Sequence, residues 1–327
     1  MKDFCIVGSG ISGSTIAKLL SKKYSLEVFD KARGPGGRTS NKRYKKNLSF
    51  DHGLQYISPK NLEFSKFIKN LKKNKILKKW EGEHFNFSSR KKNTLAKYIG
   101  KKANNDICKF SLKKINASYY TAVKKINFNS NYWSVTLENN KKIKFKSIIL
   151  TMPYPQIKTI AKNYLNKSFL NMNVKMNPGI TVLVVYKRNA IPLSSIKFKN
   201  SFIEWAANEN SKKRFKSNES LWTIQTNSNW AKKFINKYKN NQIKTTNIVL
   251  NEFSRLTGIN NNDKIFDHIH GWKYSFSSNK TNLKSYWSKK YRLGVCGDWF
   301  LGPKAEHAWL SANDLYKEIK KNPLIIK

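Results

Sequence analysis

The stretch FCIVGSGISG, residues 4–13, decides the fold of this chain. Residues 4–7 form a short apolar run that stops at a glycine, which is typical of a buried strand in a parallel sheet. Residues 11–22 follow with apolar side chains at helical spacing, and residues 26–29 are a second short apolar run. This order predicts a β-α-β unit of about 30 residues.

A glycine motif lies between the first strand and the helix. Gly8, Gly10 and Gly13 match the pattern G-x-G-x-x-G in the context that binds a dinucleotide. The first glycine permits a tight turn, the second lets the backbone approach a pyrophosphate, and the third lets helix and strand pack closely. Asp30 lies 22 residues beyond Gly8, where a carboxylate accepts hydrogen bonds from ribose hydroxyls. The unit therefore predicts a dinucleotide site.

Two further segments favour FAD over NAD as the dinucleotide. Residues 34–37 read GPGG, and Arg38 follows, so the chain can run against the cofactor and offer it a counter-charge. Near the other end, a predicted strand delivers Gly297 and Asp298, and a predicted helix starts near Glu306. The carboxylate can accept a hydrogen bond from a ribityl hydroxyl, and the helix N-terminus can stabilise the negative charge of a reduced flavin.

Several segments also match, in order, the motifs of a known family. They are FDHGLQY at residues 50–56, ILTMPYPQ at 149–156, HGWKY at 270–274, and GDW at 297–299 with EHAWLS at 306–311. Together with the glycine motif and Arg38, they resemble the flavin amine-oxidase superfamily, and its renalase-like branch in particular. The resemblance runs nearly end to end, and the order of the motifs makes it more specific than any one of them.

The resemblance implies an FAD-dependent oxidoreductase that holds FAD without a covalent link. It implies FAD contacts at Ser12, Arg38, Gln55 and Tyr56, and an adenine contact near Val123. The full set of predicted cofactor contacts is Gly8, Gly10, Ile11, Ser12, Gly13, Asp30, Lys31, Gly37, Arg38, Gln55, Tyr56, Val123, Gly297, Asp298 and Ala308.

Two positions depart from the family pattern. Gly271 stands where the family more often has Arg, which puts the substrate's anionic anchor in question. His307 stands where the family more often has Gly, and it either narrows the pocket or places a proton donor there. Trp272 and Tyr274 share one strand face, and both core packing and substrate stacking are open for them. The flavin itself is the expected catalyst. The pocket candidates are His52, His270, Trp272, Tyr274 and His307.

The predicted fold is α/β: a Rossmann-like, doubly wound FAD-binding domain with an interleaved α+β substrate domain. The FAD-binding domain is predicted from residues 1–57, 105–155 and 285–327, and the substrate domain from residues 58–104 and 156–284. Beyond the first unit, the patterns predict helices at residues 61–80, 94–102, 242–256 and 306–319, β structure at 122–149, and strands at 181–186, 221–225 and 292–296.

The composition is strongly basic. The 327 residues include 64 Lys and Arg against 19 Asp and Glu, a formal net charge of +45, which raises the question of a nucleic-acid partner. The lysines are spread along the chain and accompany many Asn, Ile, Phe and Tyr residues. The amino-acid drift of an AT-rich genome explains this composition better than a nucleic-acid site does. A positive field also favours encounters with anionic small molecules.

Cysteine usage and hydropathy indicate the compartment. Cys5, Cys108 and Cys296 show no C-x-x-C spacing, and no run reaches about 18 apolar residues. We therefore expect a cytoplasmic protein without disulfides or a membrane span. The histidines lack the zinc-motif context of cysteine or acidic partners, so no metal site is predicted.

The resemblance favours hydride transfer from a small substrate to flavin N5, with oxygen or another acceptor reoxidising the flavin. The leading substrate class is a misplaced-hydride isomer of NAD(P)H, an anionic dinucleotide. Oxidation of an amine is the first alternative, and it requires a neutral amine and an aromatic cage beside the flavin. A carotenoid- or porphyrinogen-type desaturase is disfavoured because those relatives are usually longer. A basic nucleic-acid-binding protein with a vestigial nucleotide fold is the alternative from another class.

Overall fold

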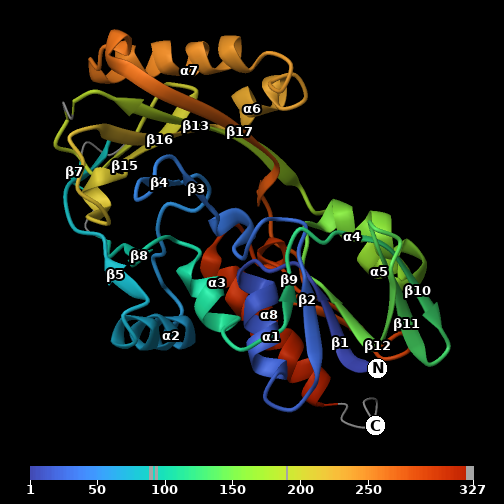
Figure 1. The fold of residues 1–327 in the computed structure, drawn as a ribbon. Coiled ribbons are helices and arrows are strands. Elements are labelled where there is room, and N and C mark those ends of the chain that lie inside the picture. The colour runs from blue at the N-terminus through green and yellow to red at the C-terminus, as the bar shows by residue number, and fades with distance from the viewer. Residues whose placement is uncertain (88–90, 93–94, 189–190, 322–327) are drawn as a thin grey trace.

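Two β-sheets organise the chain, and helices pack against both of them (Figure 1). The computed structural model describes residues 1–87, 91–92, 95–188 and 191–321. An eight-stranded sheet contains the strand before the glycine motif, and a seven-stranded sheet is built mainly from the middle of the chain. The α/β fold with a Rossmann-like unit, predicted from the sequence, is confirmed.

The eight-stranded sheet has a parallel centre and an antiparallel edge. Its strands are β1 (Lys2–Val7), β2 (Leu26–Phe29), β9 (Ala117–Ser118), β10 (Val123–Asn129), β11 (Tyr132–Leu137), β12 (Lys142–Leu150), β18 (Tyr286–Ser288) and β19 (Leu293–Val295). β1 pairs in parallel with β2 and β12, and the last residues of β12 pair in parallel with β19. β10, β11 and β12 form an antiparallel meander. The parallel strands therefore all end at one edge of the sheet.

Helices cover both faces of this sheet, as in a doubly wound fold. Side chains alternate along a strand, so Phe4 and Ile6 pack with α1 and α8, whereas Cys5 and Val7 pack in the core that includes α4 and α5. The helices are α1 (Ile11–Leu20), α3 (Asp106–Ser111) and α8 (Ala305–Lys320) near one face, and α4 (Tyr154–Ala161) and α5 (Lys167–Leu170) on the other. Burial on both faces explains why β1 is a continuous apolar run.

The seven-stranded sheet is covered on one face by helices. In spatial order its strands are β17 (Lys264–Ser277), β13 (Met176–Tyr186), β16 (Ser220–Thr226), β15 (Ile203–Asn208), β14 (Ser195–Lys197), β6 (His84–Asn86) and β7 (Lys91–Lys92). The covering helices are α6 (Ser228–Phe234) and α7 (Gln242–Thr257), and α7 lies across β13, β16 and β17 in Figure 1. Val182 and Val184 face these helices, whereas Leu183 and Val185 pack against Phe50 on the other side.

Phe50 belongs to a short hairpin that lies between the two sheets. The hairpin consists of β3 (Asn41–Arg43) and β4 (Ser49–Asp51). Short 3₁₀ turns flank the same region, namely η1 (Gly37–Thr39), η3 (Asn210–Lys212) and η5 (Asp298–Phe300). The hairpin therefore connects the glycine-rich end of the first sheet with the inner face of the second.

Two sequence-based assignments need correction. The helix predicted over residues 61–80 is α2 (Leu62–Lys73), and β5 (Leu77–Lys79) follows it. The helix predicted over residues 94–102 is wrong: β8 (Tyr98–Gly100) lies there and pairs antiparallel with β5, and residues 93–94 lie outside the described residues. A side chain at Gly100 would collide with the carbonyl oxygen of Ala103, so this glycine marks a tight backbone approach at the strand end.

Candidate functional site

The carboxyl ends of four parallel strands meet at one point. Val7 of β1 pairs with Phe29 of β2 and Leu150 of β12, and Leu150 pairs with Val295 of β19. The segments that follow these ends therefore lie together: the glycine motif, Asp30, Thr151 and the Gly297–Asp298 step. Ligands of open α/β sheets bind at such a crevice.

Two glycines of the motif, Gly8 and Gly13, have no room for a side chain, whereas a Cβ at Gly10 would lie 3.7 Å from the Gly36 carbonyl oxygen. Gly8 has φ +106°, and a Cβ there would collide with the hydroxyl of Thr151. A Cβ at Gly13 would overlap the carbonyl oxygen of Gly8. The Thr151 hydroxyl donates to the Val7 carbonyl oxygen at 2.9 Å. Glycine at these two positions is therefore required by close backbone packing, as the sequence predicts for Gly13.

The N-terminus of α1 is available to an anion. Gly10 is its N-cap and supplies no side-chain acceptor to the first-turn N–H groups, among them those of Ile11 and Ser12. The Ser12 hydroxyl donates to the Ala308 carbonyl oxygen of α8 at 3.1 Å. This bond leaves the backbone N–H groups, rather than the Ser12 side chain, to face a phosphate.

Asp30 is held in place at the end of β2. Its Oδ2 accepts hydrogen bonds from the backbone N–H of Ser9 at 2.8 Å and from the Ser9 hydroxyl, and its Oδ1 accepts from the Ala32 N–H at 2.8 Å. The backbone N–H of Thr121 donates to the Asp30 carbonyl at 2.9 Å. That bond holds the chain beside Asp30 two residues before the half-buried Val123, which begins β10. Lys31 beside it is exposed.

A second glycine loop packs on the first. The Gly36 N–H donates to the Ser9 carbonyl oxygen at 3.1 Å, and a Cβ at Gly37 would lie 3.5 Å from the Cα of Gly10. Two backbones without side chains thus lie in contact. The pair fits the close approach of a dinucleotide phosphate, which requires just such an absence of side chains.

Arg38 and Asp298, predicted from opposite ends of the chain, form an ion pair. The guanidinium binds both carboxylate oxygens, with Nη1 at 3.0 Å from Oδ2 and Nη2 in close contact with Oδ1. Nη1 also donates to the Ser275 carbonyl oxygen of β17 at 2.9 Å. Arg38 therefore ties the nucleotide end of the first sheet to the long strand of the second, in a bidentate geometry that fixes its orientation.

Helix α8 closes the same edge. The backbone N–H of Gly297 donates to the Ser311 hydroxyl at 3.0 Å. The buried Glu306 carboxylate accepts from the N–H groups of Lys60 and Asn61, at 2.6 and 2.8 Å, at the start of α2. Ala308 is buried on this helix. Among the described atoms, Nδ1 of His307 is buried without a hydrogen-bond partner.

The predicted pocket residues on β17 do gather with His52. The ring centroid of His52 lies 5.1 Å from that of Trp272, in a stacked arrangement, and 4.9 Å from that of His270. The Trp272 indole N–H donates to the His52 carbonyl oxygen at 3.2 Å. Tyr274 lies two residues further along β17, on the same face of the strand as Trp272. The ammonium group of Lys273 lies 5.8 Å from the centroid of the Tyr274 ring.

Both imidazoles of this cluster are neutral at pH 7. Burial lowers the pKa of His52 to about 3, and the neighbouring His270 adds to the effect. Burial also lowers the pKa of His270 to about 4, with smaller contributions from His268 and Lys42. The cluster is therefore a neutral aromatic surface rather than a source of protons.

Gln55 and Tyr56 lie beside this cluster in a more polar environment. The Gln55 amide donates to the carbonyl oxygens of Asp51 and Gly53, and its Oε1 accepts from Lys212 at 3.2 Å. The amide is thus fully engaged inside the protein. Any contact of Gln55 with a cofactor would therefore involve its backbone.

Sequence reasoning missed the side chains around Tyr56. Its ring centroid lies 5.6 Å from that of Trp205 and 6.3 Å from that of Trp80. The buried Lys97 ammonium lies 5.4 Å from the Tyr56 ring, and burial lowers the pKa of this lysine to about 8. Lys212 lies 5.2 Å from the Trp80 ring. No spacing in the sequence marks these positions as neighbours.

Gly271, which departs from the family pattern, has no space for a side chain. A Cβ at this position would collide with the Tyr238 ring and would lie 2.8 Å from a methyl group of Ile235. Tyr238 and Ile235 therefore occupy the volume into which a larger residue would extend.

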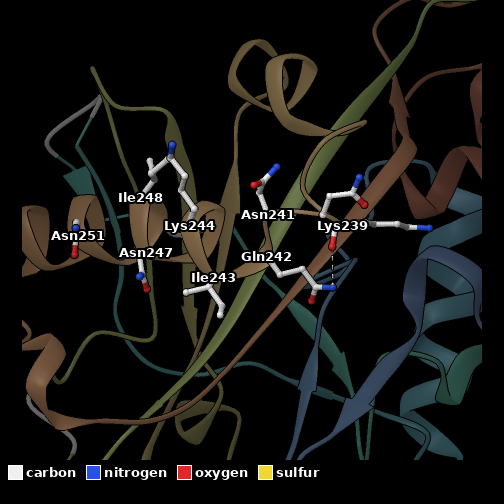
Figure 2. Close-up of a pocket in the computed structure, with 9 residues that line it drawn as sticks. Lys239, Asn241, Gln242, Ile243, Lys244, Asn247, Ile248 and Asn251 are labelled. Atoms are coloured by element: carbon white, nitrogen blue, oxygen red, sulfur yellow. Dashed lines mark hydrogen bonds between the residues drawn. The ribbon is translucent and has the colours of Figure 1, made fainter.

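Two surface hollows lie away from these residues. The larger, of ≈ 740 Å³, is formed by Lys239 and by residues of the first two thirds of α7, among them Asn247 and Asn251 (Figure 2). A smaller one, of ≈ 290 Å³, lies beside Gly82. Neither contains a predicted site residue.

Metal and membrane features are also absent from the described part of the chain. No cluster of His, Cys, Asp and Glu there could hold a metal ion. None of the helices in the described ranges has the length and apolarity to cross a bilayer. All three cysteines are free and buried, and burial raises the pKa of the Cys296 thiol.

Comparisons with known proteins agree with this geometry. Residues 6–71 match the model of the NAD(P)-binding Rossmann-like domain. The chain is similar to renalase of Mus musculus, with 29% identity over 177 residues that cover 51% of each chain. It is also similar to an uncharacterized protein of Methanocaldococcus jannaschii, with 26% identity over 212 residues, 56% of this chain and 57% of the other. The chain thus spans about half the length of the curated relatives it matches.

Solved structures extend the similarity of the fold to nearly the whole chain. A "Putative protoporphyrinogen oxidase" from Exiguobacterium sp. 255-15 has a TM-score of 0.74 at 8% identity, covering 98% of this chain and 99% of its own. Putrescine oxidase bound to putrescine has a TM-score of 0.70 at 12% identity, covering 98% of both chains. Cyclohexylamine oxidase from Brevibacterium oxydans IH-35A has a TM-score of 0.70 at 10% identity, covering 98% and 99%. The similarity to renalase agrees with the resemblance that the motifs indicated, and the chain has the same fold as these solved oxidases.

Proposed function

We propose that this protein is an FAD-dependent oxidoreductase that removes a hydride from a small anionic substrate. The observation that carries the proposal is the meeting of two glycine-rich loops with Asp30 at the ends of the parallel strands. The similarity to renalase supports the same reading. We assign residues 1–57, 105–155 and 285–327 to FAD binding, and residues 58–104 and 156–284 to the substrate side.

The residues present fit a non-covalently held FAD. The N–H groups at the start of α1 would face the pyrophosphate, Asp30 would accept from ribose hydroxyls, and the chain near Val123 would face adenine. The paired Arg38 and Asp298 would lie towards the flavin half, next to Tyr56 and the backbone of Gln55. All three cysteines are buried, so a thiol tether to the flavin is not expected. When bound, a flavin supplies an acceptor for two electrons and one proton.

The residues of the pocket do not supply a strong base, and the proposed chemistry does not need one. A dihydropyridine that loses a hydride becomes an aromatic pyridinium, so no proton has to be removed from it. The neutral rings of His52, His270 and Trp272, which pack against one another, offer an uncharged aromatic contact to such a ring. Oxygen or another acceptor takes up the electrons in the second half of the reaction. The leading substrate is therefore a dihydropyridine dinucleotide with its hydride in the wrong ring position.

Two features favour an anionic substrate over an amine. The net charge of +45 attracts anions. Of the aromatic rings that could form an amine cage, that of Tyr56 already lies next to the ammonium group of Lys97. A cationic amine would meet a like charge there. Amine oxidation therefore stays the second candidate, and nucleic-acid binding the third.

The three free, buried cysteines suit the reducing cytoplasm, which we propose as the location.

The test is a visible absorption spectrum of the purified protein, followed by anaerobic mixing with isomerised NADH and, separately, with ordinary NADH and putrescine. We expect a flavin spectrum that bleaches within seconds with the isomers and not with the other two. Bleaching by putrescine alone would transfer the proposal to amines. A colourless protein that does not take up added FAD would overturn it and make salt-dependent nucleic-acid binding the next assay.

A further inference from the structure

A buried ion network lies between the two sheets, outside the residues predicted from the sequence. Lys212 and Arg214 supply two positive charges, and Asp51 and Glu209 supply two negative ones. The side chains of Lys212, Asp51 and Glu209 are fully buried, and that of Arg214 is 3% exposed. Four opposite charges out of water leave the cluster neutral, which is the condition for burying them.

Lys212 makes the central contacts. Its ammonium lies 2.9 Å from Oδ2 of Asp51, 3.0 Å from Oε1 of Glu209 and 3.2 Å from Oε1 of Gln55. An ammonium has three N–H donors, and each has an acceptor here. The contact with Gln55 fixes which way its amide points, because the amide NH₂ then faces the carbonyl oxygens of Asp51 and Gly53.

Arg214 completes the support of the same segment. It contacts Asp51 at 2.5 Å, the Gly100 carbonyl oxygen at 3.0 Å and Oδ1 of Asn104 at 2.9 Å. The Asn104 amide in turn donates to the carbonyl oxygens of Leu54 and Gln55, at 2.6 and 3.0 Å. The segment from Asp51 to Gln55 therefore owes its conformation to side chains that lie far away in the sequence.

The segment leads directly to the candidate flavin contacts. The Leu54 N–H donates to the Arg38 carbonyl oxygen at 2.9 Å, and a Cβ at Gly53 would collide with that oxygen. The Gly53 carbonyl oxygen accepts from the Gln225 amide of β16 at 2.7 Å. Tyr56 follows Gln55, whose side chain is bound by Lys212 and whose carbonyl oxygen is bound by Asn104. Contacts thus run without a gap from Lys212 to both Arg38 and Tyr56.

We propose that Lys212 is a positioning residue, which holds the 51–56 segment so that Tyr56 and Arg38 face the flavin correctly. The inference rests on the proposed flavin site and adds a residue to it. Lys212 touches neither substrate nor cofactor in this account. Replacing a charged group that is buried in a network leaves its partners unpaired, so the segment has to rearrange.

The test compares Lys212→Met, Lys212→Arg and Lys216→Met with the wild-type protein. Lys216 is an exposed lysine on the same loop and is the matched control. For each, the flavin content, visible spectrum, flavin midpoint potential, kcat and KM are measured. We expect Lys212→Met to keep flavin, shift the spectrum and potential, and lower kcat by about tenfold or more with a smaller change in KM. Lys212→Arg should restore most of the loss, and Lys216→Met should match the wild-type protein.

A second variant guards against misfolding. Lys212→Met combined with Glu209→Gln removes one charge of each sign, so the network stays neutral, and it should show the same shifts in spectrum and potential. A folded Lys212→Met or double variant with wild-type spectrum, potential and kcat would overturn the positioning role, even if thermal stability fell. A wild-type protein that binds no flavin would instead overturn the proposed function, and this inference with it.

Discussion

The glycine loops at the end of the first sheet and the ion network against the second sheet are fixed by opposite kinds of contact. In the glycine loops, the glycines let backbone lie against backbone at Gly10 and Gly37, without side chains between them. In the network, four charged side chains fill the space and fix a neighbouring loop. The first region is built from residues close in sequence, whereas the second depends on contacts between residues 161 positions apart. Local motifs thus specify the cofactor cradle, and long-range polar contacts specify what faces the cofactor.

The largest effect is expected in the cradle. Gly13→Ala should abolish flavin retention and lower the thermal stability, because the added Cβ would overlap the Gly8 carbonyl oxygen. Gly34→Ala is the matched control, since a Cβ there meets nothing within 4 Å. Visible absorbance of the purified variants and their melting temperatures with added FAD measure both effects. Normal flavin content in Gly13→Ala would show that the loop is not the tight cradle described.

An intermediate effect is expected where the two regions join. Arg38→Ala removes the bidentate pair with Asp298 and the bond to Ser275, and should destabilise the protein by on the order of 2 kcal/mol. Because Asp298 is buried, its carboxylate would be left without this partner. Urea unfolding of the apoprotein measures the stability, and FAD titration measures the affinity. Equal unfolding midpoints for Arg38→Ala and the wild-type protein would contradict a structural role for the pair.

The smallest effect is a pH dependence from the histidine cluster. The folded-state pKa of His270, about 4, lies below its ordinary value of 6.5, so the unfolded chain binds more protons between these values. The contribution of neutral His270 to the free energy of unfolding is therefore fully present above about pH 6.5, and it is lost as the pH falls towards 4. In His270→Gln, the loss of unfolding free energy on acidification should be smaller than in the wild-type protein by about 1–2 kcal/mol, a value that allows for the partial exposure of the ring. Unfolding curves at pH 7.5 and 4.5 measure it, and parallel losses in both proteins would rule out a titrating His270.

The comparison also explains what could be predicted from the sequence. The strand ends and the glycine motif were predictable, because their geometry depends on residues 4–30 and on the parallel pairing of short apolar strands. The pairing of Arg38 with Asp298 was not predicted, although both residues were singled out, since they lie 260 positions apart. Lys97 and Lys212 look like any of the many other lysines until the fold buries them. The strand at Tyr98–Gly100 was misread as a helix because its pairing partner, β5, was itself hidden inside a predicted helix.

The order of the chain has a consequence for biosynthesis. The cradle is begun by β1 and the glycine motif but needs β19, Asp298 and Ser311, which leave the ribosome almost three hundred residues later. The first β-α-β unit therefore emerges with an open sheet edge and no partner for Arg38. A dinucleotide that requires the whole cradle would therefore bind only after α8 has been synthesised.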